Sequence, residues 1–593
     1  MRFTVFISII ICFSSCANLN TTEEAIESDN LELSHLFEDY WEKRMQFFPL
    51  EATVAGDNRY NHRLNLDITE SFRDSLRQYY TTFLNQLNQF KREDLNENDQ
   101  LSYDIFKYDM ETQLEALNFN DHYIPFQQFW GLPLTIGQLG SGESSQPFKT
   151  VEDYRNWMSR ANSFAVWADS AIANFRKGIE ADYVLPKSLV IKMIPQMKDM
   201  SDPDSVKNIF YRPLRNMPAE VESDTVLKTD FYNTISKNVL PAYKRLADFL
   251  QNEYLPKARS TSGINVVPGG DEYYSYLTRY WTTTNKTPEE IYNTGLAEVQ
   301  RIRGEMEKIK TEVGFKGDLN AFFEYMRTDK KFMSYKTPDE VLNAFRSIQQ
   351  KIDPNLKKMF NRTPKTGFEI RQTEAFRAAS ASAEYQQGTP DGSRPGIFYV
   401  PIVDATKFNT TSGMESLFLH EAIPGHHYQT SLQQENETLP RFRRFSWYGA
   451  FGEGWALYSE GLGKELGLYT DPYQYMGALG DEIHRAVRLV VDVAIHTKGM
   501  TREEAIKYMT DNMAMSEEAA TAEIERYMAI PAQALSYKIG SIKIWELRIK
   551  YSQQLGNKFN LAEFHDELLK DGVMPLDIAE RKMDVWASKK RGK

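Results

Sequence analysis

The sequence predicts a mainly α-helical protein: a large multi-helix body with a deep cleft and a small β-sheet beside the helix that carries the site. Apolar residues recur at three- and four-residue spacing through most of the chain. Helix-start signals also repeat, as in Thr-Pro-Glu-Glu at 287–290, Thr-Pro-Asp-Glu at 337–340 and Thr-Arg-Glu-Glu at 501–504. Strand signals are few, and the clearest is Gly-Ile-Phe-Tyr-Val at 396–400.

Length and composition are those of a large globular protein. The chain has 593 residues, of which 41% are hydrophobic and 26% are charged, and its net charge is -12. It is long enough for two or more ordinary domains or for one large helical body. The acidic balance argues against nucleic-acid binding, and we expect no nucleic-acid partner.

The N-terminus predicts export. Arg2 precedes an apolar run from Phe3 to Phe13 that is too short to span a bilayer and is typical of a secretory signal. The following Ser-Ser-Cys resembles a bacterial lipoprotein box, although Leu usually stands where this chain has Phe13. We expect residues 1–16 to be a signal peptide with Cys16 as the lipidated first residue of the mature protein, and residues 17–30 to be a polar tether. An uncleaved anchor is the alternative.

Either arrangement holds the body outside the cytoplasm at a membrane. We expect a membrane lipoprotein of a bacterial cell envelope, on the outer membrane. The only other cysteine, Cys12, would leave with the signal, so the mature body would have no disulfide and no thiolate metal ligand.

Residues 31–260 form a predicted N-terminal helical half. Amphipathic helices are expected over residues 31–48, 72–90, 101–117, 151–179 and 225–254. Residues 126–142, rich in aromatics and glycine, predict a long loop. Residues 260–270, which end in Pro-Gly-Gly, are the best internal boundary, and residues 271–593 form the second half, which carries the candidate site.

Three of the nine histidines fall within residues 420–427, and Glu421 directly follows the first of them. Imidazoles beside a carboxylate are typical of zinc sites, but the familiar pattern is His-Glu-x-x-His with both histidines on one helix face. Here the next histidine is six positions after His420, beyond Pro424-Gly425. A turn widened at that pair would return His426 to the face of His420, whereas an unbroken helix would favour His427. We favour His426 and keep His427 as the alternative ligand.

A second acidic segment lies downstream, in Gly-Glu-Gly-Trp-Ala-Leu-Tyr-Ser-Glu at 452–460. Glu453 and Glu460 are seven residues apart and therefore share a helix face. Carboxylates on an otherwise apolar segment are costly unless they are paired or bound to metal. We predict Glu453 as the third metal ligand and Glu460 as the partner that orients an imidazole. Two solvated carboxylates would be the simpler alternative.

The remaining candidates are weaker. An edge strand before the metal helix could pair with substrate backbone, with Arg394 and Tyr399 lining it, or it could be an ordinary hairpin. Hydroxyl and imidazole groups can donate to a developing oxyanion, and a guanidinium or an ammonium can pair with a peptide carboxylate. Ordinary packing and pairing would explain each of these residues as well. The catalytic candidates are His496 and Tyr537, and the substrate-binding candidates are Arg394, Tyr399, Arg488, Arg526 and Lys538.

The chain resembles the domain-of-unknown-function family 885. The segments that carry the resemblance are His-Glu-Ala-Ile-Pro-Gly-His-His-Tyr-Gln at 420–429, Glu-Gly-Trp-Ala-Leu-Tyr-Ser-Glu at 453–460, Pro-Asp-Gly-Ser-Arg-Pro-Gly at 390–396, and residues 48–57 and 533–540. The resemblance covers nearly the whole mature chain. It implies a helical, zinc-dependent peptidase-like fold distantly related to the gluzincins, with His420, His426 and Glu453 as ligands and Glu421 as the base. Val400-Pro401 replaces an asparagine associated with the end of the edge strand.

Together these features predict an exported, lipid-anchored zinc metallopeptidase that binds one Zn²⁺ per chain and hydrolyses short peptides. Glu421 would act as general base. A zinc amidohydrolase acting on cell-wall or glutamyl conjugates is one alternative. The other is a non-catalytic helical nutrient-binding lipoprotein, which would not need His420, Glu421, His426 and Glu453 together.

Overall fold

The computed structural model describes residues 30–592, except for 374–381, 390–391, 393 and 412. The predicted signal peptide, Cys16 and the tether up to residue 29 therefore lie outside the described residues. The described part is mainly α with one small sheet, as the sequence predicts. The helices of the N-terminal half are α1 (Leu31–Phe47), α2 (Pro49–Val54), α3 (Glu70–Leu87), α4 (Glu97–Ala116), α5 (Leu132–Gly140), α6 (Val151–Glu180), α7 (Lys187–Met200), α8 (Arg212–Arg215), α9 (Ala219–Glu222), α10 (Thr225–Thr234) and α11 (Leu240–Phe249).

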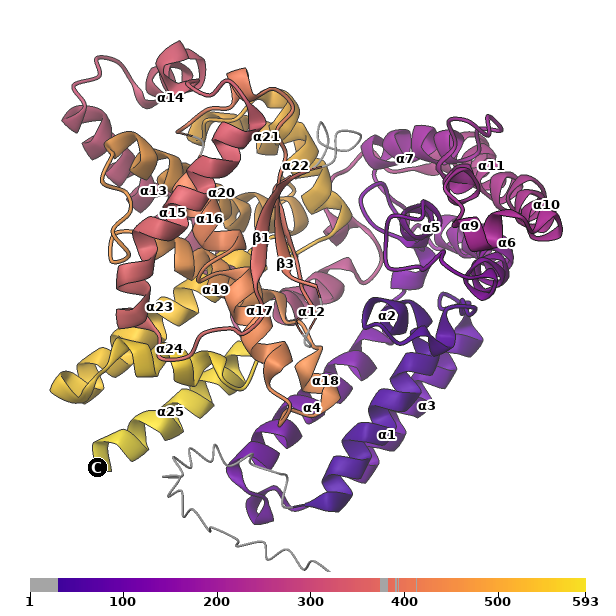
Figure 1. Ribbon diagram of the computed structural model, residues 1–593, viewed down its shortest axis with the longest axis horizontal. Helices are drawn as coiled ribbons and strands as arrows, with labels where there is room; N and C mark the ends of the chain where they lie inside the picture. The colour runs from indigo at the N-terminus through magenta and orange to yellow at the C-terminus, as the bar shows by residue number, and fades with distance from the viewer. Residues whose placement is uncertain (1–29, 374–381, 390–391, 393, 412, 593) are drawn as a thin grey trace, which may run out of the picture.

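The second half contains the remaining helices. They are α12 (Gly270–Thr282), α13 (Pro288–Glu312), α14 (Leu319–Thr328), α15 (Pro338–Met359), α16 (Met414–Glu421), α17 (His426–Glu435), α18 (Arg441–Arg444), α19 (Gly449–Gly461), α20 (Pro472–Thr497), α21 (Arg502–Asn512), α22 (Glu517–Ala529), α23 (Leu535–Leu555), α24 (Leu561–Leu569) and α25 (Leu576–Gly592). In Figure 1 these elements gather on one side, α1 to α4 form an elongated group below, and α5 to α11 form a group opposite.

Local sequence explains where several of these helices begin. Thr287 and Thr501 close capping boxes with Glu290 and Glu504, and the Thr337 hydroxyl accepts a hydrogen bond from the Glu340 backbone. Prolines stand in the first turns of α13 and α15, where a missing N–H costs nothing. One expectation is wrong: residues 126–142 are not a continuous loop, because Leu132–Gly140 forms α5 with Pro133 in its first turn.

The sheet has three strands, β1 (Phe368–Gln372), β2 (Glu384–Gln386) and β3 (Gly396–Val400), in the order β1-β3-β2. β3 pairs in parallel with β1 and antiparallel with β2. The predicted strand at 396–400 is therefore present, but it is the central strand and not an edge.

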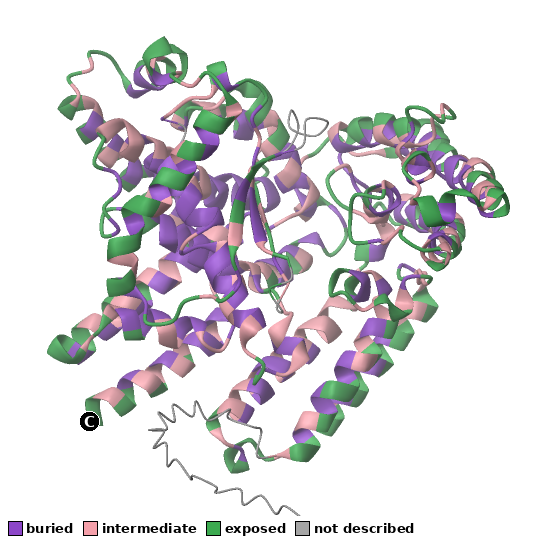
Figure 2. Cartoon of the chain, in the orientation of Figure 1, coloured by how far each residue is buried: buried purple, intermediate pink, exposed green. Residues whose placement is uncertain are grey.

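The hydrophobic cores join the two halves. One core combines side chains of α6, α7 and α11 with side chains of α13, α20 and α22. A second combines α1, α3 and α4 with α15, α19, α23 and α25. Figure 2 shows the buried residues concentrated among α16, α19 and α20. Within the described residues, no helix has the length and apolar character needed to cross a bilayer.

Candidate metal centre

The site begins at a break between two helices. α16 ends at Glu421, the next four residues leave the helical path through a cis Ile423–Pro424 bond, and α17 starts at His426. A Cβ on Gly425 would lie 1.9 Å from the carbonyl oxygen of His420, so only glycine allows this close approach. The predicted widened turn is therefore wrong: the chain changes direction between the two histidines.

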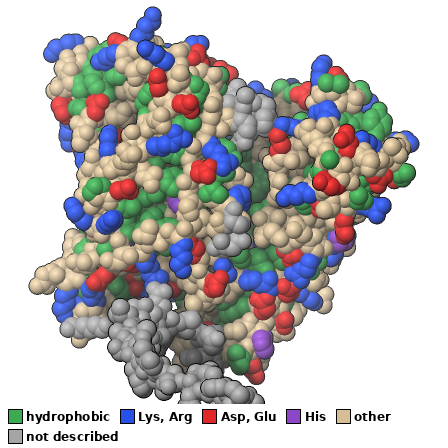
Figure 3. All heavy atoms as spheres, viewed as in Figure 1, with side chains coloured by type: hydrophobic (Ala, Val, Ile, Leu, Met, Phe, Trp, Pro, Cys, Tyr) green, Lys and Arg blue, Asp and Glu red, His purple; other side chains and the backbone are tan. Residues whose placement is uncertain are grey.

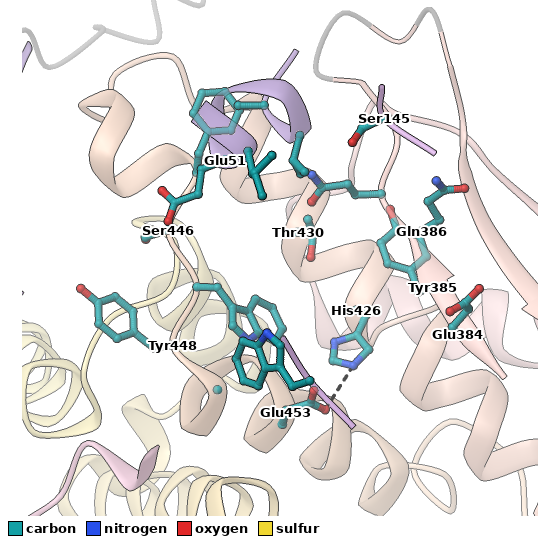
Figure 4. A pocket seen from close by; sticks show the side chains of 18 of the residues that line it. Glu51, Ser145, Glu384, Tyr385, Gln386, His426, Thr430, Ser446, Tyr448 and Glu453 are labelled. Carbon is teal, nitrogen blue, oxygen red and sulfur yellow. Dashed lines mark ion pairs between the residues drawn. The ribbon is translucent and has the colours of Figure 1, made fainter. Parts of the chain in front are cut away.

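With the helix broken here, His420 and His426 both face the carboxylate of Glu453. His420 Nε2 lies 3.6 Å and His426 Nε2 lies 3.4 Å from Oε2 of Glu453, which α19 supplies. One possible ligand atom from each of the three residues falls within 4.8 Å of the others. Figure 4 shows His426 and Glu453 facing each other at the base of the cavity. Two imidazoles and one carboxylate are the donor set that a zinc ion takes in hydrolytic sites.

Groups behind the cluster fix its geometry. His420 Nδ1 donates to Glu460 Oε1 over 2.7 Å, which leaves Nε2 to face the cluster. The Arg485 guanidinium lies 3.7 Å from the same carboxylate oxygen. Trp455 Nε1 donates to the carbonyl of Pro424 over 2.7 Å, which ties the helix break to α19. Glu460 thus makes the contact expected of a residue that orients a ligand.

His427 lies elsewhere. Its Nδ1 is 3.0 Å from the Tyr385 hydroxyl and 3.3 Å from the Ser431 hydroxyl, and its ring packs against Phe368 at 5.0 Å between centroids. Burial lowers the pKa of His427 to about 4. Its ring contacts strands β1 and β2, and it is not part of the three-residue cluster.

The charges of the cluster favour a cation. Burial works to raise the pKa of Glu453, but His426 and His420 outweigh it and hold that pKa well below its usual range. Burial works to lower the pKa of His420, but hydrogen bonds to Glu453 and Glu460 outweigh it and raise this pKa to about 10. Protons and metal ions compete for the same imidazole lone pair, so carboxylates that attract a proton here attract a metal cation as well. The three residues therefore fit a divalent metal.

Glu421 sits beside the cluster without joining it. Its side chain is buried yet lines the cavity. Burial raises the pKa of Glu421, and the nearby His420 and His426 oppose the shift. Among the described residues, no hydrogen bond or ion pair engages its carboxylate. A buried, unpaired carboxylate next to a metal ligand set is suited to accepting a proton.

The cluster opens into a cleft with a volume of about 2370 Å³. The lining comes from both halves: α1, α2, α4 and α5 on one wall, and β2, α16, α17, α19, α20 and α22 on the other. In Figure 4, Glu51 of α2 and Ser145 of the loop after α5 lie across the cavity from His426 and Glu453. This is the deep cleft that the sequence predicts.

The sheet meets the cleft through β2. Glu384, Tyr385 and Gln386 line the cavity, and β3 pairs on its other side. In the described part of the chain β2, which lines the cleft, is an outer strand of the sheet, whereas β3, the expected edge strand, has partners on both sides. Arg394 and Tyr399 still line the cavity, as predicted from their place in the sequence.

Three other predicted residues also line the cleft. The Arg488 guanidinium lies 4.7 Å from the centre of the Tyr537 ring and donates to Tyr527 Oη (2.9 Å) and Glu523 Oε2 (3.1 Å). Arg526 donates to Gln533 Oε1 over 2.9 Å, and its Nε is buried without a partner among the described residues. Arg488, Arg526 and Tyr537 all lie on the cavity wall.

Two predictions do not fit the structure. His496 is fully buried: Ile264 N donates to its Nδ1 (3.0 Å), and its Nε2 donates to the carbonyl of Tyr527 (3.0 Å). With both ring nitrogens occupied it cannot stabilise an oxyanion. Lys538 is also buried and makes ion pairs with Glu298 (2.9 Å) and Glu482 (2.7 Å). It links α23 to α13 and α20 instead of binding substrate.

Sequence reasoning missed several cavity residues. Trp447 lies 5.8 Å from His426 between ring centroids and is 50% exposed. Tyr385 contacts His427. Trp447 stands six residues before Glu453, so its position beside the acidic segment was a usable signal. No comparable signal in the sequence marked Tyr385, since β2 is only three residues long.

The sequence of the chain matches a known protein family. The model of a family described as "Bacterial protein of unknown function (DUF885)" matches residues 49–583. The chain belongs to the DUF885 family. No curated protein matches it.

Two solved structures share the fold. One is described as "the putative lipoprotein from Colwellia psychrerythraea": it is 28% identical, has a TM-score of 0.87, and the match covers 94% of this chain and 99% of that one. The other is "a putative lipoprotein of unknown function from Shewanella oneidensis", 19% identical with a TM-score of 0.72, covering 93% and 99%. At that identity the second likeness concerns the fold alone. The DUF885 fold thus extends over nearly all of this chain.

Proposed function

We propose that this DUF885 protein is a zinc-dependent metallopeptidase that hydrolyses short peptides. The observation that carries the proposal is the convergence of His420, His426 and Glu453 in a cleft, with Glu421 unpaired beside them. A non-catalytic binding protein has no need for an unpaired buried carboxylate next to a ligand set, because burying such a group costs free energy.

Each residue of the site has its own role in the proposed hydrolysis. His420, His426 and Glu453 would hold one zinc ion, and Glu460 keeps the His420 ring in the tautomer that ligation requires. When bound, the ion would polarise the scissile carbonyl and lower the pKa of a water molecule. Glu421 takes the proton of the attacking water and passes it to the leaving amine. Tyr537, which lines the cleft, is the candidate donor to the oxyanion.

The shape of the cleft sets the substrate class. Both walls are folded helical structure, and His426 and Glu453 face each other inside the cavity in Figure 4. An extended oligopeptide fits such a cavity, whereas a folded protein is excluded from its base. Arg488 of α20 and Arg526 of α22 supply positive charge on the cavity wall and would pair with a substrate carboxylate.

The location we propose is the bacterial cell envelope. The Phe-Ser-Ser-Cys ending at 13–16 and the description of the Colwellia psychrerythraea neighbour as a lipoprotein both support it. Lipid attached at Cys16 would hold the enzyme at a membrane, with the outer membrane as the expected site. In Figure 3, acidic and basic side chains are intermixed over the visible face, which fits a body that contacts the membrane only through its lipid.

The zinc content of the protein and its variants tests the predicted ligand set. Purified protein should contain about one zinc per chain after reconstitution, because the three side chains leave an open fourth position. His426→Ala should lose the metal. His427→Ala is the matched control and should keep it, since His427 contacts Tyr385 and Ser431 and not the cluster. Elemental analysis that finds zinc in His426→Ala but not in His427→Ala would refute the ligand set.

A further inference from the structure

A carboxylate with no counter-ion lies on the far wall of the cleft. Asp109 comes from α4 in the N-terminal half, lines the cavity and accepts a hydrogen bond from Tyr448 Oη over 2.6 Å. Tyr448 immediately precedes α19, the helix that carries Glu453. Asp109 therefore connects the N-terminal wall to the element that supplies the metal cluster.

The charges around Asp109 leave one negative charge unbalanced. The nearest cation is Arg44, but its guanidinium already donates to both oxygens of Glu51, at 2.9 and 3.0 Å. No Lys, Arg or His among the described residues makes an ion pair with Asp109. Arg44, Glu51 and Asp109 together thus carry a net charge of -1.

Aromatic rings lie near this carboxylate: Tyr448 donates a hydrogen bond to it, and its charge acts on Tyr108 and Tyr280. Tyr108 and Tyr448 lie 6.4 Å apart between ring centroids, and Tyr280 packs edge-on against Trp281 at 5.2 Å. All four rings line the same cavity as Asp109. Burial raises the pKa of Asp109 to about 6, with the Tyr448 hydrogen bond opposing the shift. A carboxylate among aromatic faces is poorly solvated on its own, and a cation placed there gains both an ion pair and cation–π contacts.

We propose that Asp109 and these aromatic rings form a subsite for a primary ammonium group of the peptide substrate. The inference rests on the proposed peptidase function and specifies which peptides it acts on. Glu453 lies five positions after Tyr448 in the chain, a rise of about 7.5 Å on a helix. In Figure 4 the Tyr448 ring points away from Glu453, so the subsite lies farther from Glu453 than the helix rise alone.

That spacing relates the ammonium group to the cleaved bond. An extended peptide covers about 3.3–3.6 Å per residue, so roughly two to four residues would separate the bound ammonium from the metal cluster. The group could be the peptide's free N-terminus or a lysine side chain. Both present the same –NH₃⁺ to Asp109, and matched peptides distinguish the two sources.

The test measures binding separately from cleavage. Zinc-loaded Glu421→Gln protein would be incubated with a mixed hexapeptide library in free-amine form, and with the same library N-acetylated, and captured peptides would be quantified by mass spectrometry. We expect the free-amine library to be enriched about 10-fold or more, since a buried charge-assisted hydrogen bond is worth about 1.5–3 kcal/mol. Acetylated peptides that are nevertheless captured should carry lysine if the side chain is the source.

The charge is then removed from one residue at a time, in the Glu421→Gln background. Asp109→Asn keeps the acceptor for Tyr448 but not the charge, and should abolish the preference for free amines. Glu143→Gln is the matched control: Glu143 also lines the cleft but is paired with Arg212, so its loss should leave the preference unchanged. Circular dichroism would verify that both variants are folded.

Each outcome separates the two proposals. Equal capture of both libraries without enrichment of lysine, capture of neither, or a preference for ammonium-bearing peptides that survives Asp109→Asn would overturn the ammonium subsite. If wild-type protein cleaves acetylated, lysine-free peptides as fast as free ones, the peptidase proposal stands and the subsite fails. If the preference depends on Asp109 but wild-type protein cleaves nothing, the subsite stands and the peptidase proposal fails.

Discussion

At the scale of single residues, the role of each buried histidine is decided by what its nitrogens contact. His420 gives one nitrogen to Glu460 and faces Glu453 with the other. His427 faces hydroxyl groups of Tyr385 and Ser431. His496 has backbone partners on both sides. Only the first arrangement joins an ionised carboxylate to a nitrogen free to bind a cation.

The carboxylate of Asp492 allows a test of how burying an ionisable group lowers the stability of the folded protein. Tyr274 Oη (2.7 Å) and Ala532 N (3.0 Å) donate to its Oδ1, while Oδ2 has no partner among the described residues. Burial raises the pKa of Asp492 to about 7, against roughly 4 when unfolded. Between those values the folded protein holds the extra proton, so this group makes the protein less stable as the pH rises towards 7.

The prediction is that Asp492→Asn removes this contribution. The melting temperature of wild-type protein should fall more between pH 5 and pH 8 than that of Asp492→Asn. The exposed Asp74→Asn variant deletes the same charge from α3 and should behave like wild type. Differential scanning calorimetry across that range measures both, and parallel curves for wild type and Asp492→Asn would contradict the account.

Residue spacing predicted part of the site. His420 with Glu421, and Glu453 with Glu460, follow from adjacency and from helical period, and both pairs lie at the cluster. The choice between His426 and His427 depended on the path of residues 422–425, which propensity alone does not define. Lys538 and His496 were misassigned because a residue's type gives its chemistry but not the residues that it contacts. Glu298, which pairs with Lys538, and Ile264, which donates to His496, both lie in distant segments of the chain.

At the scale of elements, the site depends on two helices that cross at glycines. α19 and α23 pack extensively, with Gly454 facing Gly540. A Cβ on Gly540 would lie 1.8 Å from the carbonyl oxygen of Ala450, and one on Gly454 would lie 2.5 Å from the backbone of Gly540. The absence of side chains lets α19 sit deep enough to present Glu453 to the cluster.

Gly540→Ala should therefore separate the helices. We expect a loss of about 1–3 kcal/mol or more in the free energy of unfolding, because overpacking shifts the backbone, together with weaker zinc binding. Gly304→Ala is the control: it lies in α13 with open space around it, and should be neutral or gain up to about 1 kcal/mol. Urea unfolding and zinc titration would measure these effects. Equal stability of the two variants would show that the crossing tolerates a methyl group.

Element prediction succeeded where local signals were strong. Capping residues located the starts of α13, α15 and α21, and apolar spacing located α1, α3, α4 and α6. β1 and β2 were missed because they are short and largely exposed, with little apolar alternation. Strand order was missed as well: β3 was expected at an edge, yet it lies between β1 and β2.

At the scale of the whole molecule, the cleft exists because two halves of the chain share their cores. Side chains from residues before 260 pack with side chains after 271 in both large clusters. Arg441 of α18 also pairs with Glu42 of α1 at 2.6 Å. The wall that carries Asp109 is thereby held at a fixed distance from the wall that carries the cluster.

We predict that residues 271–593 do not fold independently. Without the first half, side chains such as Val299 and Met306 on α13 and Val490 on α20 would lose apolar neighbours, and the exposed surface would favour aggregation. The fragment should show no cooperative thermal transition by circular dichroism, while the mature chain shows one. A cooperative transition of the fragment close to that of the mature chain would mean that the halves are separate domains.

The central claim is that Glu421 acts as the base of a metal-dependent hydrolase, and Glu421→Gln tests it most directly. Glutamine keeps the size of the side chain but cannot accept the proton, and Glu421 is not one of the three clustered ligands. Cleavage of a peptide library should fall by about 10²-fold or more, while zinc content stays at the wild-type level. Cleavage at the wild-type rate by zinc-loaded Glu421→Gln protein would contradict the mechanism.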